Sequence, residues 1–488
     1  MPLIRIISTD GLNLHRTPHV VLSHCWGGEI ACSTKKEKIE QYQKSIDVGK
    51  LPKSFREAIE ITAALGIWYI WIDSLCIIQD DDADWKRESV KMASIFRGAT
   101  LTLSMSTAKG SSEGCGISVP LPPAIHFTTV KKGKGQPPAF FALKKNAPGE
   151  NRQETHEVMR NAPVNTRAWI FQEKILSQRI LHATQGMFIW QCTAHVETED
   201  SMIHDNSLTN STPWKILTSH LTGRISNSDV DIRHQWWTWS NDYMVRALTK
   251  VQDHYAAFAG VTNLYQDITG DEPILGLWKR DLPIHLAWHA SKSNTWTPLK
   301  ERRVATWTWM TFPHTSIKPN NFSKFEYRVF DGRGKKKELD VWMRYQAEMV
   351  SYDIGWDGTA LVTAPKYGSL ILKGFLDKIT LPKNRDPSPS EDSDGFTYLD
   401  PDYLDEGFQL EKGHMPSFDA FALFAYEQEG TLVTEPSILL TVYVVLKKLN
   451  DEEERYMRIG LVNKWVSLSP EVTVETCLSR PRQTIVLV

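Results

Sequence analysis

The sequence predicts an α/β protein whose N-terminal part folds around a parallel sheet and whose C-terminal part is rich in β-strands. Residues 19–105 alternate between apolar strand-like runs and amphipathic helical stretches, which is the order of right-handed β–α–β crossovers. Residues 236–290 have a mainly helical pattern. From residue 300 onward short β-like runs dominate, among them residues 361–363, 369–372 and 438–445.

The length and composition are those of a folded chain with several domains. The chain has 488 residues, 41% of them hydrophobic and 23% charged, whereas one ordinary domain takes about 150 residues. We expect three parts: residues 1–200, an α/β domain; residues 201–310, mainly helical; and residues 311–488, β-rich. The net charge of −2 leaves no global basic field to hold nucleic acid or an anionic membrane.

The six cysteines indicate an intracellular chain without a metal centre. They are scattered, with no CxxC pair and no close Cys/His cluster, so we expect reduced thiols, no metal site and a cytoplasmic location. The first residues lack the basic-then-apolar order of a signal peptide. The most apolar long window, residues 61–78, contains Asp73 and a helix stop at Gly66, so we expect no membrane span.

The first strand and the first clear helix are identified by the residues at their ends. Residues 19–23 form a short apolar run that stops before Gly27 and Gly28, which is typical of a buried strand ending in a glycine turn. Ser54 and Glu57 have the spacing of a capping box, and Gly66 supplies a left-handed stop. We therefore expect a helix between Ser54 and Gly66.

The next elements repeat this order. Residues 68–72 are aromatic and β-branched without polar alternation, which predicts a central parallel strand covered on both faces. The carboxylates at residues 80–84 are suited to the N-terminus of the following helix, from about residue 85 to 96, which stops at Gly98. Residues 100–105 are expected to form the third strand.

The rest of the chain is less regular. We interpret residues 118–160 as a long surface excursion and residues 387–394 as a disordered loop. Residues 179–182 and 187–190 predict two strands joined as a hairpin through residues 185–186.

Ligands of such sheets bind beyond the carboxyl ends of the parallel strands. Here those ends carry Ser23, His24, Trp26, Gly27 and Asp73. The glycines at 27 and 28 would let a backbone approach a ligand, although a plain tight turn has the same sequence. A carboxylate after five apolar residues needs a partner when it is buried, so Asp73 is either a ligand-binding group, a backbone cap or half of a salt bridge.

Four ordered blocks form a signature in the first part of the chain. They are residues 22–28 (Leu-Ser-His-Cys-Trp-Gly-Gly), residues 51–59, residues 65–80 followed by Asp84, Trp85 and Glu88, and residues 165–177 (Asn-Thr-Arg-Ala-Trp-Ile-Phe-Gln-Glu-Lys-Ile-Leu-Ser). Together these blocks resemble the fungal heterokaryon-incompatibility (HET) domain. Two further segments, around residues 237–259 and at residues 305–309, have a looser likeness to long proteins of this family, and we recognise no resemblance in residues 311–488. The chain departs from the family at Val21, Phe96 and Gly98, where Ala, Tyr and Asn are common, and these changes are conservative for packing.

The resemblance implies a fungal protein that triggers cell death when genetically different hyphae fuse. It also implies a fold like that of Toll/interleukin-receptor (TIR) domains, of flavodoxin-like design, for residues 1–200, with residues 201–310 as a HET-associated region. Some TIR domains cleave NAD, so the resemblance extends to NAD glycohydrolase activity, with NAD as the substrate and no cofactor.

Cleaving the nicotinamide–ribose bond places positive charge on the ribose ring, which a carboxylate can stabilise without a metal. Glu88 is the first candidate, since the order Trp85 then Glu88 on one helix looks like the TIR arrangement, with a spacing one residue shorter. Asp73 is the second. Glu88 could instead be an exposed residue that pairs with Lys86 or Lys91, or a contact to a partner.

Arg167 and Glu173 in the fourth block have three open interpretations. They form a buried pair that closes the pocket, or they form a structural bridge, or Arg167 contacts a phosphate, which suits a planar guanidinium. Cys76 with His24 could imitate a thiol nucleophile and its base, but a thiol in an apolar run is typically inert.

Two other function classes remain open. The chain could be a non-catalytic module whose tryptophans and charged loops bind a partner protein or a second copy. Alternatively, a HET scaffold could serve secondary metabolism, with some of its 18 tryptophans lining a pocket for an apolar small molecule.

Overall fold

The computed structural model of the 488-residue chain describes residues 4–10, 12, 16–28, 32–115, 125–129, 139–143, 159, 161–184, 187–199, 204–205, 229–291, 305–311, 316–319, 344–380, 397–399, 417–428, 437–450 and 453–488. The chain folds into two compact units. Unit 1 comprises Met1–Asn227 and Ala256–Val261, and unit 2 comprises Ser228–Tyr255 and Thr262–Val488.

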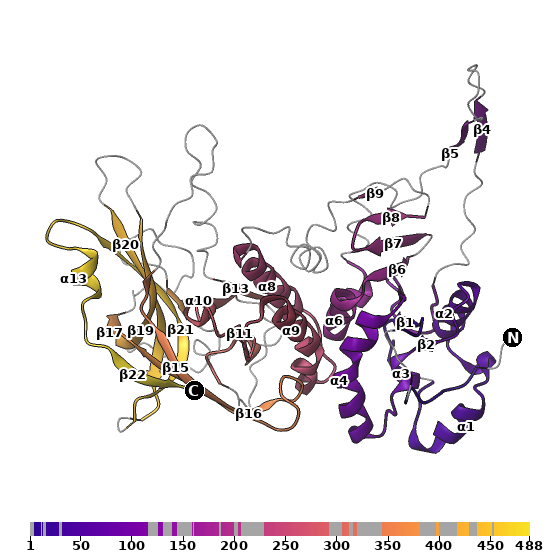
Figure 1. Ribbon diagram of the computed structural model, residues 1–488, viewed down its shortest axis with the longest axis horizontal. Helices are drawn as coiled ribbons and strands as arrows, with labels where there is room; N and C mark the ends of the chain where they lie inside the picture. The colour runs from indigo at the N-terminus through magenta and orange to yellow at the C-terminus, as the bar shows by residue number, and fades with distance from the viewer. Residues whose placement is uncertain are drawn as a thin grey trace, which may run out of the picture. The chain divides into compact units, whose positions relative to one another are not determined.

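Unit 1 contains a mixed seven-stranded sheet in the order β2-β1-β3-β6-β7-β8-β9 (Figure 1). β1 is parallel to both β2 and β3, β3 is parallel to β6, and the remaining neighbours are antiparallel. A separate hairpin joins β4 to β5. The strands are β1 (Val20–Ser23), β2 (Ile70–Trp71), β3 (Leu101–Ser104), β4 (Ile125–Thr129), β5 (Ala139–Leu143), β6 (Arg179–Ala183), β7 (Phe188–Cys192), β8 (Val196–Thr198) and β9 (His204–Asp205).

The predicted parallel sheet of the N-terminal part is confirmed, and so is the β6–β7 hairpin, whose turn residues 185–186 lie outside the described part. The prediction for residues 68–72 was wrong in one respect. Only Ile70–Trp71 form the strand β2, and β2 is an edge strand because it pairs with β1 alone in the described sheet. The aromatic run had predicted a strand covered on both faces, but its first residue, Trp68, is 89% exposed.

Helices cover both faces of this sheet. Phe55 and Ala58 of α2 join Val20, Leu22 and Leu103 in one apolar core. On the opposite face, Figure 1 shows α4 and α6 side by side. The helices are η1 (Lys36–Lys38), α1 (Ile39–Lys44), η2 (Val48–Lys50), α2 (Lys53–Ala64), α3 (Asp73–Cys76), α4 (Asp82–Gly98), η3 (Pro163–Thr166) and α6 (Ala168–Leu176).

The start of α2 differs from the prediction, whereas its end is as predicted. Ser54 and Glu57 do not form a capping box, because the helix begins earlier, after Pro52. Their side chains instead accept hydrogen bonds from the backbone N–H groups of Gly114 and Cys115. At the other end Gly66 has φ +73°, and Gly66 N and Ile67 N donate to the carbonyls of Ala63 and Thr62, as in a Schellman motif.

The start of α4 is also as predicted. Asp81 is its N-cap and accepts hydrogen bonds from the N–H groups of Ala83 and Asp84. Met92, Ile95 and Phe96 are buried, and the helix ends at Gly98.

The first half of unit 2 combines helices with short strands around tryptophans. Trp236 and Trp278 lie with ring centroids 4.9 Å apart, and Trp236 and Trp309 both donate their indole N–H to the carbonyl of Gly276. These rings are fully buried against protein, which makes them core. The elements are α8 (Asp229–Met244), η4 (Val251–His254), α9 (Ala256–Thr269, whose first residues belong to unit 1), β10 (Pro273–Ile274), β11 (Leu277–Trp278), α10 (Leu282–His285), β12 (Trp288–Ser291), η5 (Trp309–Thr311) and β13 (Ser316–Pro319).

The second half of unit 2 is the predicted β-rich region. Its nine-stranded sheet runs β14-β19-β20-β21-β22-β16-β15, with β17 paired to β19 and β18 to β21. The predicted run 361–363 is a turn, with Leu361 at φ +66°, and residues 387–394 lie outside the described part. The elements are β14 (Arg344–Tyr345), β15 (Glu348–Trp356), β16 (Pro365–Gly374), β17 (Leu376–Thr380), β18 (Thr397–Leu399), β19 (Ser417–Gln428), β20 (Ile438–Lys448), β21 (Arg455–Ser467), α13 (Val474–Leu478) and β22 (Gln483–Leu487).

Most of the predicted excursion at residues 118–160 lies outside the described residues, apart from β4 and β5. Within the described part, every helix is too short or too polar to cross a membrane.

Candidate functional site

The carboxyl ends of the parallel strands of unit 1 carry polar side chains at one level. Ser23 of β1 is in register with Ser104 of β3, and Ser104 is in register with His182 of β6. Residues paired in this way point to the same face of a sheet. Six predicted residues come together at or beside this edge, and we call them the strand-end cluster: Ser23, His24, Trp26, Asp73, Arg167 and Glu173.

Asp73 is fixed by two hydrogen bonds. It follows β2 and opens the short helix α3. The indole Nε1–H of Trp26 donates to Asp73 Oδ2 at 2.8 Å, and the backbone N–H of Ser74 donates to Oδ1 at 2.7 Å. The carboxylate therefore acts partly as the predicted cap and also holds the Trp26 side chain in one orientation.

Arg167 lies over the same tryptophan. Its guanidinium carbon is 5.7 Å from the centroid of the Trp26 ring, and its Nη1 donates to the carbonyl of His24 at 2.8 Å. Glu173 and Arg167 interact electrostatically, but no ion pair within 4.0 Å joins them in the described part. The predicted buried pair is thus a long-range interaction.

Glu173 is the most perturbed carboxyl of the cluster. It lies on α6 and is only 6% exposed. Burial raises the pKa of the Glu173 carboxyl to about 8; the Ser23 hydrogen bond and the Arg167 charge oppose this rise, and the Asp73 charge adds to it. Its Oε2 atom has no hydrogen-bond partner in the structure.

His24 is buried on the side of α2, where its ring meets the ring of Phe55 edge-on at 5.1 Å. Burial lowers the pKa of His24, the Arg167 charge adds to this effect, and Asp73 opposes it. The imidazole is therefore neutral at pH 7, and its Nε2 has no hydrogen-bond partner in the structure.

Two further predicted residues, Gly27 and Trp85, pack against other parts of the protein. Gly27 has φ +78°, and a Cβ atom there would stand 2.5 Å from the Cα of Gly110, so the close backbone approach is to the protein itself. Trp85 of α4 packs edge-on against Trp169 of α6, with ring centroids 6.3 Å apart.

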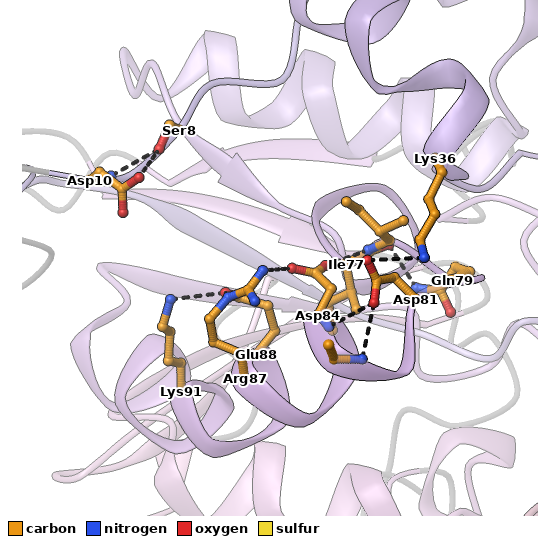
Figure 2. A network of polar contacts seen from close by, with 12 residues as sticks. Ser8, Asp10, Lys36, Ile77, Gln79, Asp81, Asp84, Arg87, Glu88 and Lys91 are labelled. Carbon is orange, nitrogen blue, oxygen red and sulfur yellow. Dashed lines mark hydrogen bonds and ion pairs between the residues drawn. The ribbon is translucent and has the colours of Figure 1, made fainter.

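Glu88 belongs to a different network of polar contacts. Figure 2 shows it on α4 beside Arg87 and Lys91, and its Oε1 is 2.9 Å from Lys91 Nζ and 3.7 Å from Arg87 Nε. Arg87 also contacts Asp84, which accepts a hydrogen bond from the N–H of Ile78. The pairing of Glu88 with Lys91 is one of the alternatives that the sequence left open.

The charges of Glu88 and Asp73 do act on one common group. Burial is the main cause that raises the pKa of the Cys76 thiol to about 12, and the charges of both carboxylates contribute to this rise. This pKa keeps the thiol protonated at neutral pH, so Cys76 is not an activated nucleophile.

One buried chain of polar side chains at the strand ends was not predicted from the sequence. Ser104 and Ser106 hydroxyls lie 3.0 Å apart, Ser106 Oγ is 3.0 Å from His182 Nδ1, and His182 Nε2 is 2.8 Å from Gln191 Oε1. Burial lowers the pKa of His182 to about 4. The signal that could have identified it is the pair of serines two residues apart at the end of the third strand, level with a histidine on the next parallel strand.

Within the described residues, no group of three or more His, Cys, Asp or Glu side chains could hold a metal ion. The cluster instead offers one fixed carboxylate, one carboxyl of raised pKa, a guanidinium and an aromatic face.

Residues 19–173 match the family model described as heterokaryon incompatibility protein (HET), which covers about a third of the chain. The match begins just before β1 and ends at Glu173, so it contains the whole strand-end cluster. The chain therefore carries a HET domain, and the resemblance seen in its four sequence blocks is confirmed. No curated protein and no solved structure matched the chain.

Proposed function

We propose that this chain acts in heterokaryon incompatibility and programmed cell death, and that it does so by hydrolysing the nicotinamide–ribose bond of NAD at the strand-end cluster. The HET domain supports the first part. The observation that carries the second is that Asp73 bonds to Trp26, whose ring lies under Arg167, while the charges of Asp73 and Arg167 both act on the buried Glu173 carboxyl.

The topology supports a flavodoxin-like, TIR-like design for this domain. Numbered in chain order, the four parallel strands β2, β1, β3 and β6 have the order 2-1-3-4, which agrees with the first four positions of flavodoxin-like sheets. In such sheets the ligand binds where the strand order reverses, here at the ends of β1 and β3. Ser23 ends β1 and hydrogen-bonds to Glu173.

The chemistry requires two groups. When the bond between C1′ and the pyridinium nitrogen breaks, its electron pair goes to nicotinamide and positive charge develops on the ribose ring. Asp73, held by Trp26 and Ser74, supplies the stabilising carboxylate. Water then adds to C1′ and gives a proton to ionised Glu173, so the products are ADP-ribose, nicotinamide and one proton.

Glu88 is the other carboxylate that could stabilise the ribose charge. Its ion pairs with Lys91 and Arg87 favour a structural role, while its influence on Cys76, shared with Asp73, places it in the neighbourhood of α3. A Glu88→Gln variant therefore belongs in the same experiment.

The test is release of nicotinamide from NAD by the purified full chain, followed by chromatography. We expect release by the wild type, and a loss of about a hundredfold or more in Asp73→Asn and in Glu173→Gln. The matched control is Glu40→Gln, which changes an exposed glutamate of α1 and leaves the rate unchanged.

No release at enzyme concentrations comparable to that of NAD, or full release by both cluster variants, would contradict the catalytic proposal. If only Glu88→Gln loses nicotinamide release, Glu88 of α4, and not Asp73, is the carboxylate that stabilises the ribose charge.

A second candidate function, a non-catalytic interaction module, is favoured by the exposed side chains of Leu65, Trp68 and Tyr69. They precede β2, whose outer edge is unpaired in the described sheet, so a second copy of the chain could pair with it across a twofold axis. Dimers that dissociate on Trp68→Ser, together with cell toxicity that survives combined Asp73→Ala and Glu88→Ala, would support this function. A monomeric wild type would oppose it.

A further inference from the structure

Arg167 is a half-buried cation without a carboxylate beside it. Its contacts are the His24 carbonyl at 2.8 Å and the face of Trp26 at 5.7 Å. Among the described residues no Asp or Glu oxygen lies within 4.0 Å of its guanidinium. One Nη group is engaged, and the guanidinium carries further N–H donors that can form two parallel bonds to an anion.

The guanidinium belongs to the residue at the start of α6. Arg167 is the N-cap of this nine-residue helix, no side chain caps it, and its first turn contains no acidic residue. The first N–H groups of a helix and its dipole favour a negative group at this end. The positive end of α6 and the Arg167 cation thus lie at the same point of the chain.

Two buried polar atoms without partners lie in the same cluster. Glu173 Oε2 and His24 Nε2 have no hydrogen bond, and both side chains are more than nine-tenths buried and interact electrostatically with Arg167. An unsatisfied buried polar atom costs about 1–3 kcal/mol, and a bound ligand is one way to satisfy it.

We propose that the strand-end cluster binds a diphosphate group, held by the Arg167 guanidinium and the N-terminus of α6. The ligand class is a nucleoside diphosphate or its derivatives, with inorganic pyrophosphate as the minimal form. The inference shares its site with the proposed function and names the part of the substrate that this site grips, but it requires no bond cleavage.

The test is calorimetric titration of the full chain with ADP, with inorganic pyrophosphate and with adenosine. We expect ADP and pyrophosphate to bind, more weakly as salt is added, and adenosine to bind at least about tenfold more weakly than ADP. Binding of ADP with no binding of pyrophosphate would show that the base, not the diphosphate, is recognised, and would overturn the proposal.

The variant that isolates the guanidinium is Arg167→Gln, for which we expect at least about a tenfold loss in affinity for ADP and pyrophosphate. The matched control is Arg56→Gln, because Arg56 Nη1 likewise donates to a backbone carbonyl, that of Leu51, at 3.1 Å. We expect its affinity to equal that of the wild type.

Equal affinity of Arg167→Gln and wild type would overturn the proposal. If Arg167→Gln does not fold, Arg167→Lys replaces it; a lysine keeps the charge but not the planar fork, and we expect an intermediate loss. If the chain binds diphosphate through Arg167 but never releases nicotinamide, this inference stands and the proposed hydrolysis is wrong. If the chain hydrolyses NAD and Arg167→Gln leaves the KM for NAD unchanged, the proposed hydrolysis stands and this inference is wrong.

Discussion

At the residue scale, Glu173 makes one contribution to the pH dependence of stability that has a clear sign. The pKa of its carboxyl is about 4.3 in an unfolded chain and about 8 in the folded unit. Between these two values the folded state binds more protons than the unfolded state, so raising the pH removes stability. The contribution of Glu173 to the free energy of unfolding is fully present below the pKa of the unfolded chain and is lost as the pH rises towards 8.

We therefore expect Glu173→Gln to gain stability relative to the wild type as pH increases from about 5 to about 8, by about 1.4 kcal/mol per pH unit. The measurement is urea unfolding followed by circular dichroism at three pH values. Glu40→Gln, an exposed glutamate, should run parallel to the wild type. A Glu173→Gln curve that also runs parallel would show that Glu173 is ionised throughout.

The residues of the candidate site were identified from the sequence more completely than their contacts were. The rule that ligands bind beyond parallel strand ends led to Ser23, His24, Trp26 and Asp73, and these do lie together. The sequence could not show that Trp26 rather than an arginine would bond to Asp73, since the two are 47 residues apart. The assignment of Glu88 remains a prediction.

At the element scale, the sequence predicted a helix end correctly where that end is determined by contacts between residues close in the chain. Gly66 ends α2, and Asp81 starts α4, because each acts on backbone groups only a few residues away. The capping box failed because Ser54 and Glu57 bond to residues 114–115, about sixty positions later, a contact that no local pattern contains. The edge position of β2 is likewise a property of the sheet and not of the run 68–72.

The link between α2 and the segment at residues 114–115 gives a prediction for this element. Ser54→Ala leaves the buried Gly114 N–H without its acceptor, so we expect a loss of about 1–3 kcal/mol in unfolding free energy. Because the segment is released, labelling of the buried Cys115 thiol should also become faster, as read by peptide mass spectrometry.

The matched control for this prediction is Ser94→Ala, an exposed helical serine whose hydroxyl bonds only to its own helix. If Ser54 acted as a helix cap instead, the variant would speed hydrogen exchange at the first turn of α2 and leave Cys115 labelling unchanged.

At the scale of the whole molecule, the sequence predicted the class of each half for different reasons. Residues 19–105 alternate between strand-like and helical runs, which predicts parallel strands with crossover helices, and unit 1 has four such strands within a mixed sheet. The long strands β19, β20 and β21 were visible as apolar runs, but their order in the nine-stranded sheet depends on pairings between distant segments. Trp236, Trp278 and Trp309 lie in the core of unit 2, an outcome that composition alone does not decide.

If Asp73 and Glu173 form one catalytic pair, the rate of NAD hydrolysis depends on the ionisation of Glu173. The measurement is kcat/KM for NAD hydrolysis between about pH 6 and about pH 9.5, in the wild type and in Glu173→Gln. The raised pKa of Glu173 predicts a wild-type rate that climbs with pH, has its midpoint at about pH 8 and levels off above it, and a variant that lacks this inflection. The same inflection in both proteins, or a flat wild-type profile, would contradict the pair.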